Sequence, residues 1–257
     1  MSSTLDKENF ENILGYQVCL LDVHGAIGKI SEWIFSGEKR KVFICANPHS
    51  LVEANKDRLF HEAICEADMI TPDGTGIVLA SKILGGSIRE RVTGSDIFWE
   101  LSEVLNRSGG SSYFFLGSTE QTLAAIKTKI SIDFNNIKFY GSYSPPYKPE
   151  FSEEESRLMI EAVNAAEPDV LWVGMTAPKQ EKWIYQHRDQ LNVKFIGAIG
   201  AVFDFYVGNV KRSHPVFQKM GLEWLPRLLQ EPRRLFRRNF VSSPLFLLQV
   251  LRQRLRQ

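Results

Sequence analysis

The stretch PDVLWVGMTAPKQE, residues 168–181, decides the fold. Its apolar run Val170–Val173 is short and unbroken, as expected for a strand whose two faces are both covered. The turn after it leads through Pro178 into Lys179–Leu191, an amphipathic segment that predicts a helix. A strand followed by a turn and a helix is the repeating unit of α/β proteins.

The same unit recurs along most of the chain. Further strands are predicted at Gln17–Leu21, Lys41–Cys45, Asp68–Ile70, Tyr113–Leu116, Lys138–Tyr140 and Lys194–Ile196. Helices are predicted between them at Pro48–Ile64, Gly74–Leu84, Asp96–Leu105, Thr119–Ile130 and Glu153–Ala165, and the proline-rich segment 141–149 is predicted to be a loop. We therefore predict an α/β fold, a Rossmann-like and largely parallel sheet flanked by helices.

The C-terminal tail differs from the rest of the chain in charge. Residues 226–257 contain eight arginines and a single acid, Glu231, a formal charge of +7, whereas the whole chain carries +1. Leucine and phenylalanine lie between the arginines. The sequence thus predicts an α/β domain over residues 1–225 and a basic, amphipathic helical appendage over residues 226–257. We expect two helices there, with Pro232 and Pro244 in their first turns and Ser243 as the N-cap of the second.

This appendage favours a partner whose surface is anionic and apolar. Residues 245–251 (LFLLQVL) are too apolar for a freely solvated helix and too short to span a membrane. Two surfaces could cover these residues: the headgroup layer of an anionic membrane, or a second subunit in a homo-oligomer. A docked helix with a solvated basic face is a further interpretation of the arginines. Nucleic acid is not expected as a partner, since no lysine follows Lys219.

Composition bounds the protein's class. A hydrophobic content of 44% and a charged content of 24% are ordinary for a folded soluble domain. Three scattered cysteines, Cys19, Cys45 and Cys65, indicate a reducing compartment. The first ten residues do not resemble a secretory signal, and no apolar run reaches the about 18 residues of a membrane span. We expect a cytoplasmic protein, peripheral on the inner face of the cell membrane.

Polar residues follow several predicted strands. They lie in Asn47–His49, Thr71–Gly76, Arg89–Asp96, Phe114–Thr119, Ala177–Glu181 and Gly197–Phe205. Because the carboxyl ends of parallel strands meet at one edge of a sheet, these loops predict a polar crevice there. Asp73, directly after a strand and before Gly74, suits a general base, with capping of the next helix as the alternative.

Several chemistries are not supported by the sequence. The five histidines form no pair at metal-ligand spacing, and no GxSxG elbow, nucleotide-binding GxGxxG or GxxxxGK[ST] loop occurs. Asp-x-Asp, the usual short motif for Mg²⁺ on a nucleotide diphosphate, is also missing. We therefore expect no metal and no cofactor. An enzyme of this kind would stabilise an anionic leaving group with arginines and backbone amides.

A set of seven blocks carries a family resemblance. In order they are Asn47, TPDGTG (71–76), RERVTGSD (89–96), FFLGS (114–118), PDVLWVGMTAPKQE (168–181), GAIGAVFDFYVGNVKRSHP (197–215) and GLEWLPRLLQEPRRLFRR (221–238). Together they resemble the WecG/TagA/CpsF family, glycosyltransferase family 26, over about residues 16–240. The resemblance implies an inverting transferase, peripheral on the membrane, that passes a sugar from a UDP donor to a polyprenyl-diphosphate-linked acceptor in bacterial surface polysaccharide synthesis.

The resemblance also implies roles for individual residues. Asp73 matches the family's proposed catalytic base, and Asn47, Arg91 and Gln180 match polar residues of its substrate pocket. The tail arginines Arg227, Arg234 and Arg237 match arginines thought to close over the site and contact diphosphate groups. Cys45 departs from the family's usual threonine, and Ser213-His214-Pro215 departs from its more usual Arg-Ala-Pro.

The resemblance does not single out one transferred sugar. A hexose or an N-acetylhexosamine, including N-acetylmannosamine and glucose, is compatible with the family. Two other functions fit parts of the sequence: a nucleotide-sugar-modifying enzyme would share the α/β body, and a nucleic-acid-binding module would explain the basic tail.

Overall fold

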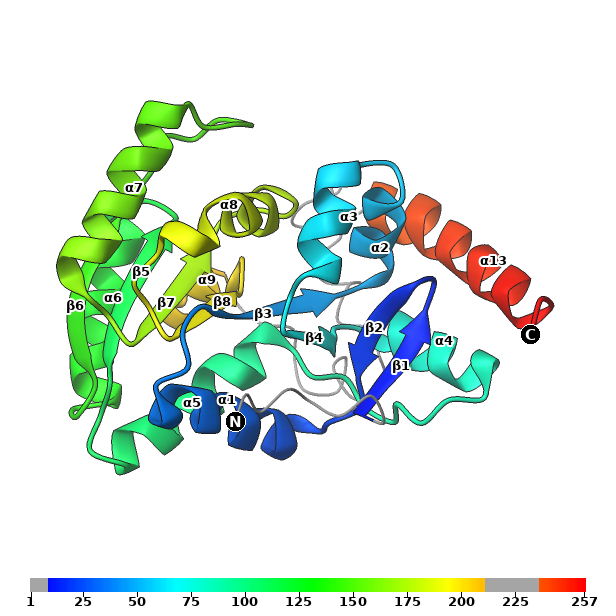
Figure 1. The fold of residues 1–257 in the computed structure, drawn as a ribbon, viewed down its shortest axis with the longest axis horizontal. Helices are drawn as coiled ribbons and strands as arrows, with labels where there is room; N and C mark the ends of the chain where they lie inside the picture. Colours follow the sequence, from blue (N-terminus) through cyan, green and yellow to red (C-terminus); the bar gives the residue numbers. More distant parts are fainter. Residues whose placement is uncertain (1–8, 211–235) are drawn as a thin grey trace.

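The computed structural model describes residues 9–210 and 236–257, without the side chains of Arg237 and Asn239. Its centre is a six-stranded sheet in the order β4-β3-β8-β7-β5-β6 (Figure 1). Every neighbouring pair in this sheet is parallel. The predicted Rossmann-like α/β fold is therefore confirmed.

The strands have the following bounds. In the sheet they are β3 (Lys41–Ala46), β4 (Met69–Pro72), β5 (Ser112–Gly117), β6 (Lys138–Tyr143), β7 (Val170–Gly174) and β8 (Phe195–Ala198). A separate antiparallel hairpin pairs β1 (Phe10–Ile13) with β2 (Tyr16–Cys19).

The helices between the strands are α1 (Val23–Ser36), α2 (Pro48–Ala54), α3 (Arg58–Cys65), α4 (Thr75–Leu84), α5 (Gly94–Arg107), α6 (Glu120–Asp133), α7 (Glu153–Ala166), α8 (Lys179–His187) and α9 (Val202–Val207). A 3₁₀ turn, η2 (Arg188–Gln190), extends α8. Near the C-terminus a π-helical segment, η3 (Arg237–Ser242), runs directly into α13 (Ser243–Arg254).

Side chains alternate between two cores along the central strands. On β5, Tyr113 and Phe115 belong to one core, whereas Phe114 and Leu116 belong to the other. Such a period of two is what a strand buried on both faces requires. The first core is closed by α1, α5, α6 and α9, and the second by α2, α3, α4, α7, α8 and α13. Figure 1 shows α1 and α5 on one side of the sheet and α3 and α8 on the other.

The predicted helix Pro48–Ile64 is in fact two helices. Asp57 accepts a hydrogen bond from the backbone N–H of Phe60 and so caps a new helix, α3, after α2 has ended. An N-cap of this kind favours a fresh helix start over continuation of the old one.

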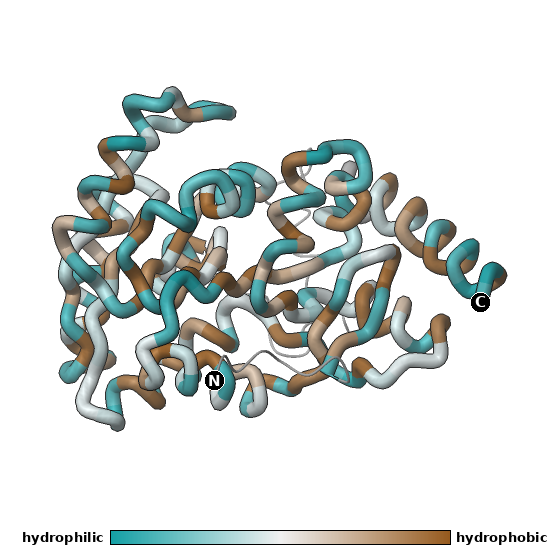
Figure 2. Tube along the Cα trace, in the orientation of Figure 1, coloured by the Kyte–Doolittle hydropathy of each residue, from teal (hydrophilic) through white to brown (hydrophobic). Residues whose placement is uncertain are grey.

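The C-terminal helix belongs to the protein's own core on one face. Phe246 and Val250 of α13 are fully buried and join the core on the side of α2 and α4. The Gln253 side chain also bonds the β1–β2 hairpin, accepting from the Leu14 N–H at 2.8 Å and donating to the Asn12 carbonyl at 3.0 Å. Neither a membrane nor a second subunit is therefore needed to cover this face. Figure 2 shows hydrophobic residues recurring along all of α13.

Ser243 does not cap α13 as predicted. The helix continues from η3 without a break, and the Ser243 hydroxyl donates to the carbonyl of Arg238 at 3.1 Å. Pro244 does lie in the first turn. Among the described residues no helix has the length and apolarity needed to cross a membrane.

Candidate active site

A cavity of about 1100 Å³ opens at the carboxyl edge of the sheet. Residues that follow β3, β4, β5, β7 and β8 line it, together with the loop after β6 and the segment around η3. Each of the six polar loops predicted to form a crevice contributes to this lining. The lining residues are Asn47–His49, Asp73–Gly76, Arg91 with Thr93–Ser95, Ser118–Thr119, Ala177–Glu181, and Ala198–Val202 with Asp204 and Phe205. The expected polar crevice is therefore present.

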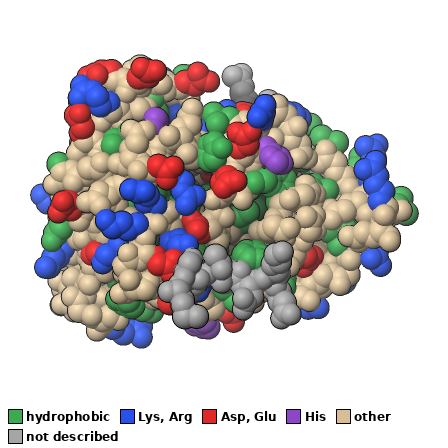
Figure 3. Space-filling view, viewed as in Figure 1, with side chains coloured by type: hydrophobic (Ala, Val, Ile, Leu, Met, Phe, Trp, Pro, Cys, Tyr) green, Lys and Arg blue, Asp and Glu red, His purple; other side chains and the backbone are tan. Residues whose placement is uncertain are grey.

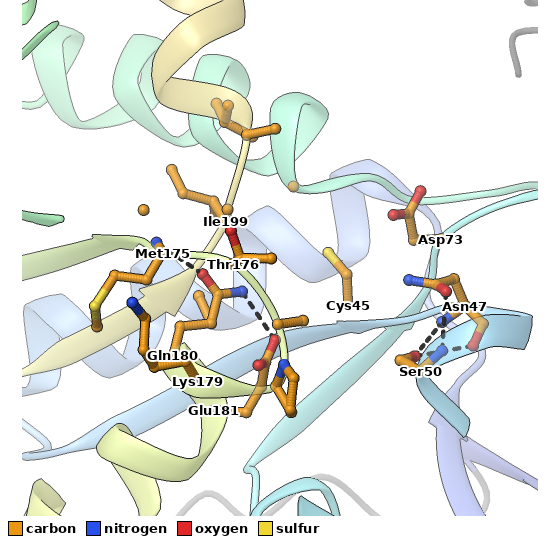
Figure 4. A pocket seen from close by; sticks show the side chains of 18 of the residues that line it. Cys45, Asn47, Ser50, Asp73, Met175, Thr176, Lys179, Gln180, Glu181 and Ile199 are labelled. Carbon is orange, nitrogen blue, oxygen red and sulfur yellow. Dashed lines mark hydrogen bonds between the residues drawn. The ribbon is translucent and has the colours of Figure 1, made fainter. Parts of the chain in front are cut away.

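Strand register places Asn47 beside Asp73. Ala46 at the end of β3 pairs with Pro72 at the end of β4, so the next residue of each strand emerges at the same edge. The Asp73 N–H donates to the Ala46 carbonyl at 2.7 Å, which continues the ladder by one bond. Figure 4 shows the two side chains on the same side of the cavity.

Asp73 does not cap the following helix. The N-cap of α4 is Gly74, whose φ of 105° suits glycine, and no side chain caps that end. The Asp73 carboxylate instead lines the cavity and is partly exposed. Of the two alternatives for this residue, helix capping is wrong. Its carboxylate lies where a ligand in the cavity would meet it.

The start of α2 holds Asn47 by a capping box. The Asn47 Oδ1 accepts from the Ser50 N–H at 3.1 Å, and the Ser50 Oγ accepts from the Asn47 N–H at 2.9 Å. The Oδ1 is thus used locally, and the Nδ2 amide group remains to donate into the cavity. Gly76 packs here: a Cβ on it would lie 2.4 Å from the Cγ of Pro48. The Asn47 and Asp73 loops therefore pack closely, with no room for a side chain at residue 76.

The segment that carries Arg91 bonds to the end of β4. The Val92 N–H donates to the Pro72 carbonyl at 2.8 Å, which brings Arg91 to the cavity next to the Asp73 loop. Thr93 and Asp96 then form a capping box that starts α5. Thr93 and Asp96 thus serve the helix start, and Arg91 faces the cavity.

Gln180 lies across the cavity from Asp73, and two hydrogen bonds hold its side chain. Its Oε1 accepts from the Met175 N–H at 3.2 Å, and its Nε2 donates to the Glu181 Oε1 at 2.8 Å (Figure 4). Because a backbone N–H can only donate, the first contact sets which end of the amide is oxygen. Burial raises the pKa of Glu181 to about 7.

The loop after β6, which packs on Lys179, forms a part of the wall that sequence analysis did not assign. The Lys179 Nζ donates to the Lys148 carbonyl at 2.8 Å and lies 4.8 Å from the centre of the Phe151 ring. Desolvation lowers the pKa of Lys179. The loop residues Ser144–Tyr147 line the cavity, and Tyr147 is 99% exposed at its rim. The prolines marked this segment as a loop, but nothing in them placed it at the site.

Cys45 lies on β3 at the base of the cavity. Its Sγ accepts a weak hydrogen bond from the Thr71 hydroxyl at 3.7 Å, across the β3–β4 pair. Burial raises the pKa of the Cys45 thiol well above its ordinary value, so the group is a neutral thiol near pH 7. A neutral, poorly bonding sulfur here offers a ligand less than a hydroxyl would.

The tail reaches the cavity through η3. Arg227 and Arg234 lie outside the described residues, and Arg237 is described only as the first residue of η3. Arg238, one residue further, lines the cavity together with Phe240 and Ser243. The His49 Nδ1 lies 2.8 Å from the Oγ of Ser242 and connects α2 to the tail. Within the described residues, the tail arginine that lines the cavity is therefore Arg238, which was not among the residues singled out.

No group of three metal-ligating side chains occurs within residues 9–210 and 236–257. The cationic side chains that line the cavity there are Arg91, Lys179 and Arg238.

Comparison with known proteins assigns the chain a family. The family model for the glycosyl transferase WecG/TagA/CpsF family matches residues 11–257. A protein of Bacillus subtilis strain 168, named N-acetylglucosaminyldiphosphoundecaprenol N-acetyl-beta-D-mannosaminyltransferase, is 31% identical over 82% of this chain and 79% of its own length. Proteins of the same name from Bacillus spizizenii and Staphylococcus aureus strain MW2 are 30% and 27% identical, over 83% and 80% of this chain and 80% and 78% of their own.

Proposed function

The chain belongs to the WecG/TagA/CpsF family of glycosyl transferases, and we propose that it transfers one sugar from a UDP-sugar to a polyprenyl-diphosphate-linked acceptor. The relatives are named for an acceptor, N-acetylglucosaminyldiphosphoundecaprenol, that joins a sugar to a lipid through a diphosphate. A polymer of the bacterial cell envelope is the expected end product.

The observation that carries this proposal is the placement of Asp73 in the cavity. In a single displacement, a base takes the proton of the acceptor hydroxyl while its oxygen bonds to the anomeric carbon. The bond between that carbon and the UDP oxygen breaks, and the electron pair leaves with UDP. One displacement inverts the configuration of the anomeric carbon. Asp73 directly follows β4 at the cavity and does not cap the next helix, so its carboxylate suits the proton-accepting role.

Base and leaving group lie on opposite sides of the carbon in such a displacement. Figure 4 shows Asp73 on one side of the cavity and Gln180 and Lys179 on the other. We therefore place the acceptor hydroxyl near Asp73 and Asn47, and the donor diphosphate toward Gln180 and Lys179. Lys179 and the tail arginine Arg238 supply positive charge for the departing UDP. Cations in this role allow a reaction that is independent of metal.

We propose an N-acetylhexosamine as the transferred sugar, with N-acetylmannosamine as the first to test, since the relatives are named for its transfer. Cys45 lies at the base of the cavity, where a change of hydrogen-bonding capacity would alter the fit of a sugar.

We further propose that the tail holds the enzyme on an anionic membrane. Val241, Leu248, Leu251 and Leu255, which we call the outward face, follow the i, i+7, i+10, i+14 spacing of one helical side and are 52%, 54%, 47% and 86% exposed. Exposed Arg252, Arg254 and Arg256 follow them, and Figure 3 shows basic side chains at this end of the molecule. Apolar residues flanked by arginine are typical of helices that lie in the headgroup layer. Because η3 reaches the cavity, such binding would bring a lipid-linked acceptor to Asp73.

The proposed reaction is tested by incubating the protein with UDP-N-acetylmannosamine and a short polyprenyl-diphosphate-linked N-acetylglucosamine, with and without EDTA. We expect a lipid product heavier by one N-acetylhexosamine, in equal amount under both conditions. No transfer from this donor or from a panel of other UDP-hexoses, by folded protein, would contradict the proposal. A product that EDTA abolishes would refute metal independence alone.

A further inference from the structure

Glu181 is a buried acid in the wall of the cavity. It lies in the first turn of α8 and is 6% exposed, although it lines a site that must admit an anionic ligand if the proposed function holds. Figure 4 shows its carboxyl group beside the Gln180 amide, on the side of the cavity away from Asp73.

The partners of Glu181 do not compensate a negative charge. Its Oε1 accepts from the Gln180 Nε2 at 2.8 Å, and its Oε2 is buried without a hydrogen-bond partner in the described part of the chain. No described lysine, arginine or histidine forms an ion pair with it, although Lys179 precedes it by two residues. An ionised carboxylate buried in this way is costly, whereas a neutral carboxylic acid is not.

Burial therefore dominates the titration of this group. Its pKa is raised to about 7, against the hydrogen bond from Gln180 and a backbone bond, both of which favour the ionised form. The other acids that line the cavity do not stabilise the ionised form of Glu181, since like charges repel. The charged or titratable side chains that line the cavity, within the described residues, are Cys45 of β3, His49 and Glu53 of α2, Asp73 and Arg91 of the loops after β4, Glu120 of α6, Tyr147 of the loop after β6, Lys179 of α8, Asp204 of α9 and Arg238 of η3.

We propose that Glu181 is a positioning residue for Gln180 and that it acts as a neutral carboxylic acid, so that binding of the UDP part of the donor is coupled to uptake of one proton by Glu181. This inference rests on the proposed function, because it takes UDP as the ligand.

The geometry explains why the neutral form is the binding form. The Met175 N–H and Glu181 hold the Gln180 amide at both ends, which leaves the second N–H of Nε2 for the donor. A neutral acid keeps this arrangement, since its carbonyl oxygen still accepts from Gln180. An ionised Glu181 would instead place a negative charge beside the diphosphate, in a wall that water does not screen. The proton comes from solvent and stays on the Glu181 carboxyl group while UDP is bound.

Calorimetric titration of the full-length protein with UDP from pH 6 to pH 8 tests the coupling. Glu181→Gln keeps an accepting oxygen and cannot ionise. If UDP binds the neutral form alone, about one tenth of the wild-type protein is competent at pH 8. We therefore expect Glu181→Gln to bind UDP about tenfold more tightly than wild type at pH 8 and equally at pH 6. Comparison of the two proteins cancels the titration of UDP itself.

Proton uptake is measured directly by repeating the titration at pH 8 in buffers of different ionisation enthalpy. Wild type is expected to take up about one proton more than Glu181→Gln. Glu120→Gln, which removes an exposed carboxylate of the same cavity, should retain the wild-type uptake.

Equal affinities of wild type and Glu181→Gln at both pH values, with equal proton uptake, would overturn the inference and leave the proposed function standing. Failure of folded wild-type protein to bind UDP at any pH would refute the proposed donor instead. Thermal unfolding of each variant confirms that the compared proteins are folded.

Discussion

The outward face of the tail gives a quantitative prediction for membrane binding. Its residues Leu248, Leu251 and Leu255 are 54%, 47% and 86% exposed, which together correspond to about two fully exposed leucines. Burial of one leucine side chain contributes about 1.5–3 kcal/mol, so full immersion of these three would contribute about 3–6 kcal/mol. Replacing all three by serine should therefore weaken partition onto vesicles by at least about 100-fold.

The assay is cosedimentation with vesicles that contain an anionic phospholipid. Ile132→Ser is a matched control, because Ile132 is 74% exposed and lies on α6, at the opposite end of the molecule (Figure 1). We expect this control to bind vesicles as wild type does. Since all four side chains are exposed, neither variant should lose much thermal stability.

Vesicle binding of the triple serine variant at the wild-type level would refute the reasoning. The exposed leucines would then be available for contact with a second copy of the chain, which sedimentation of wild type without lipid would detect. Loss of binding in both the triple variant and Ile132→Ser would show that vesicle binding depends on exposed apolar residues in general and is not specific to the outward face.

Three further predictions follow from buried or tightly packed groups. Phe246→Ala should lower the free energy of unfolding of the whole domain by about 3–5 kcal/mol in denaturant titrations, because Phe246 is fully buried in the core; a change below 1 kcal/mol would show that α13 is not part of the cooperative unit. Glu181→Gln should raise the melting temperature relative to wild type at pH 8 and little at pH 4.5: the folded-state pKa of about 7 exceeds the ordinary 4.5, so the wild type loses up to about 3 kcal/mol as pH rises between them. An equal difference at both pH values would contradict this. Gly76→Ala should reduce transfer strongly, because its Cβ would lie 2.4 Å from Pro48 and displace the Asn47 loop, whereas Gly28→Ala, with no atom within 4 Å of the new Cβ, should not; equal activity of the two variants would refute the packing argument.

The fold was predictable because the strands are unmistakable. Runs such as Val170–Val173 are buried on both faces and carry no polar residue that could suggest a helix. The helix α1 was not predicted, and Gly25 and Gly28 within it weaken the local preference for a helix. Its stability comes instead from buried Ile30, Trp33 and Ile34, which pack against the sheet.

The location of the site was predictable from topology, since residues after parallel strands meet at one edge. Asn47, Asp73, Arg91 and Gln180 all line the cavity as the sequence predicted. The role of each side chain was not predictable in this way. The Asn47 Oδ1 caps the start of α2, whereas Gly74 and not Asp73 occupies the N-cap position of α4. Both facts depend on backbone geometry.

The tail shows where composition alone misleads. The apolar residues 245–251 suggested a surface that needs an external partner, yet Phe246 and Val250 are covered by the protein's own core. Which residues of a helix point inward depends on the surface that receives it, and here α2, α4 and the β1–β2 hairpin form that surface. The leucines on the other side stay exposed, and the proposed membrane contact rests on them.

Mass spectrometry of the lipid product made by wild type and by Asp73→Asn tests the central claim most directly. UDP-N-acetylmannosamine and a polyprenyl-diphosphate-linked N-acetylglucosamine serve as substrates, and UDP binding by the variant confirms an intact site. We predict transfer of one sugar by wild type and a rate about 10²–10⁴-fold lower for Asp73→Asn, as expected when a general base is removed. Wild-type turnover by Asp73→Asn would contradict the assignment of Asp73 as the base, and no product from folded wild type with any UDP-sugar would contradict the proposed reaction itself.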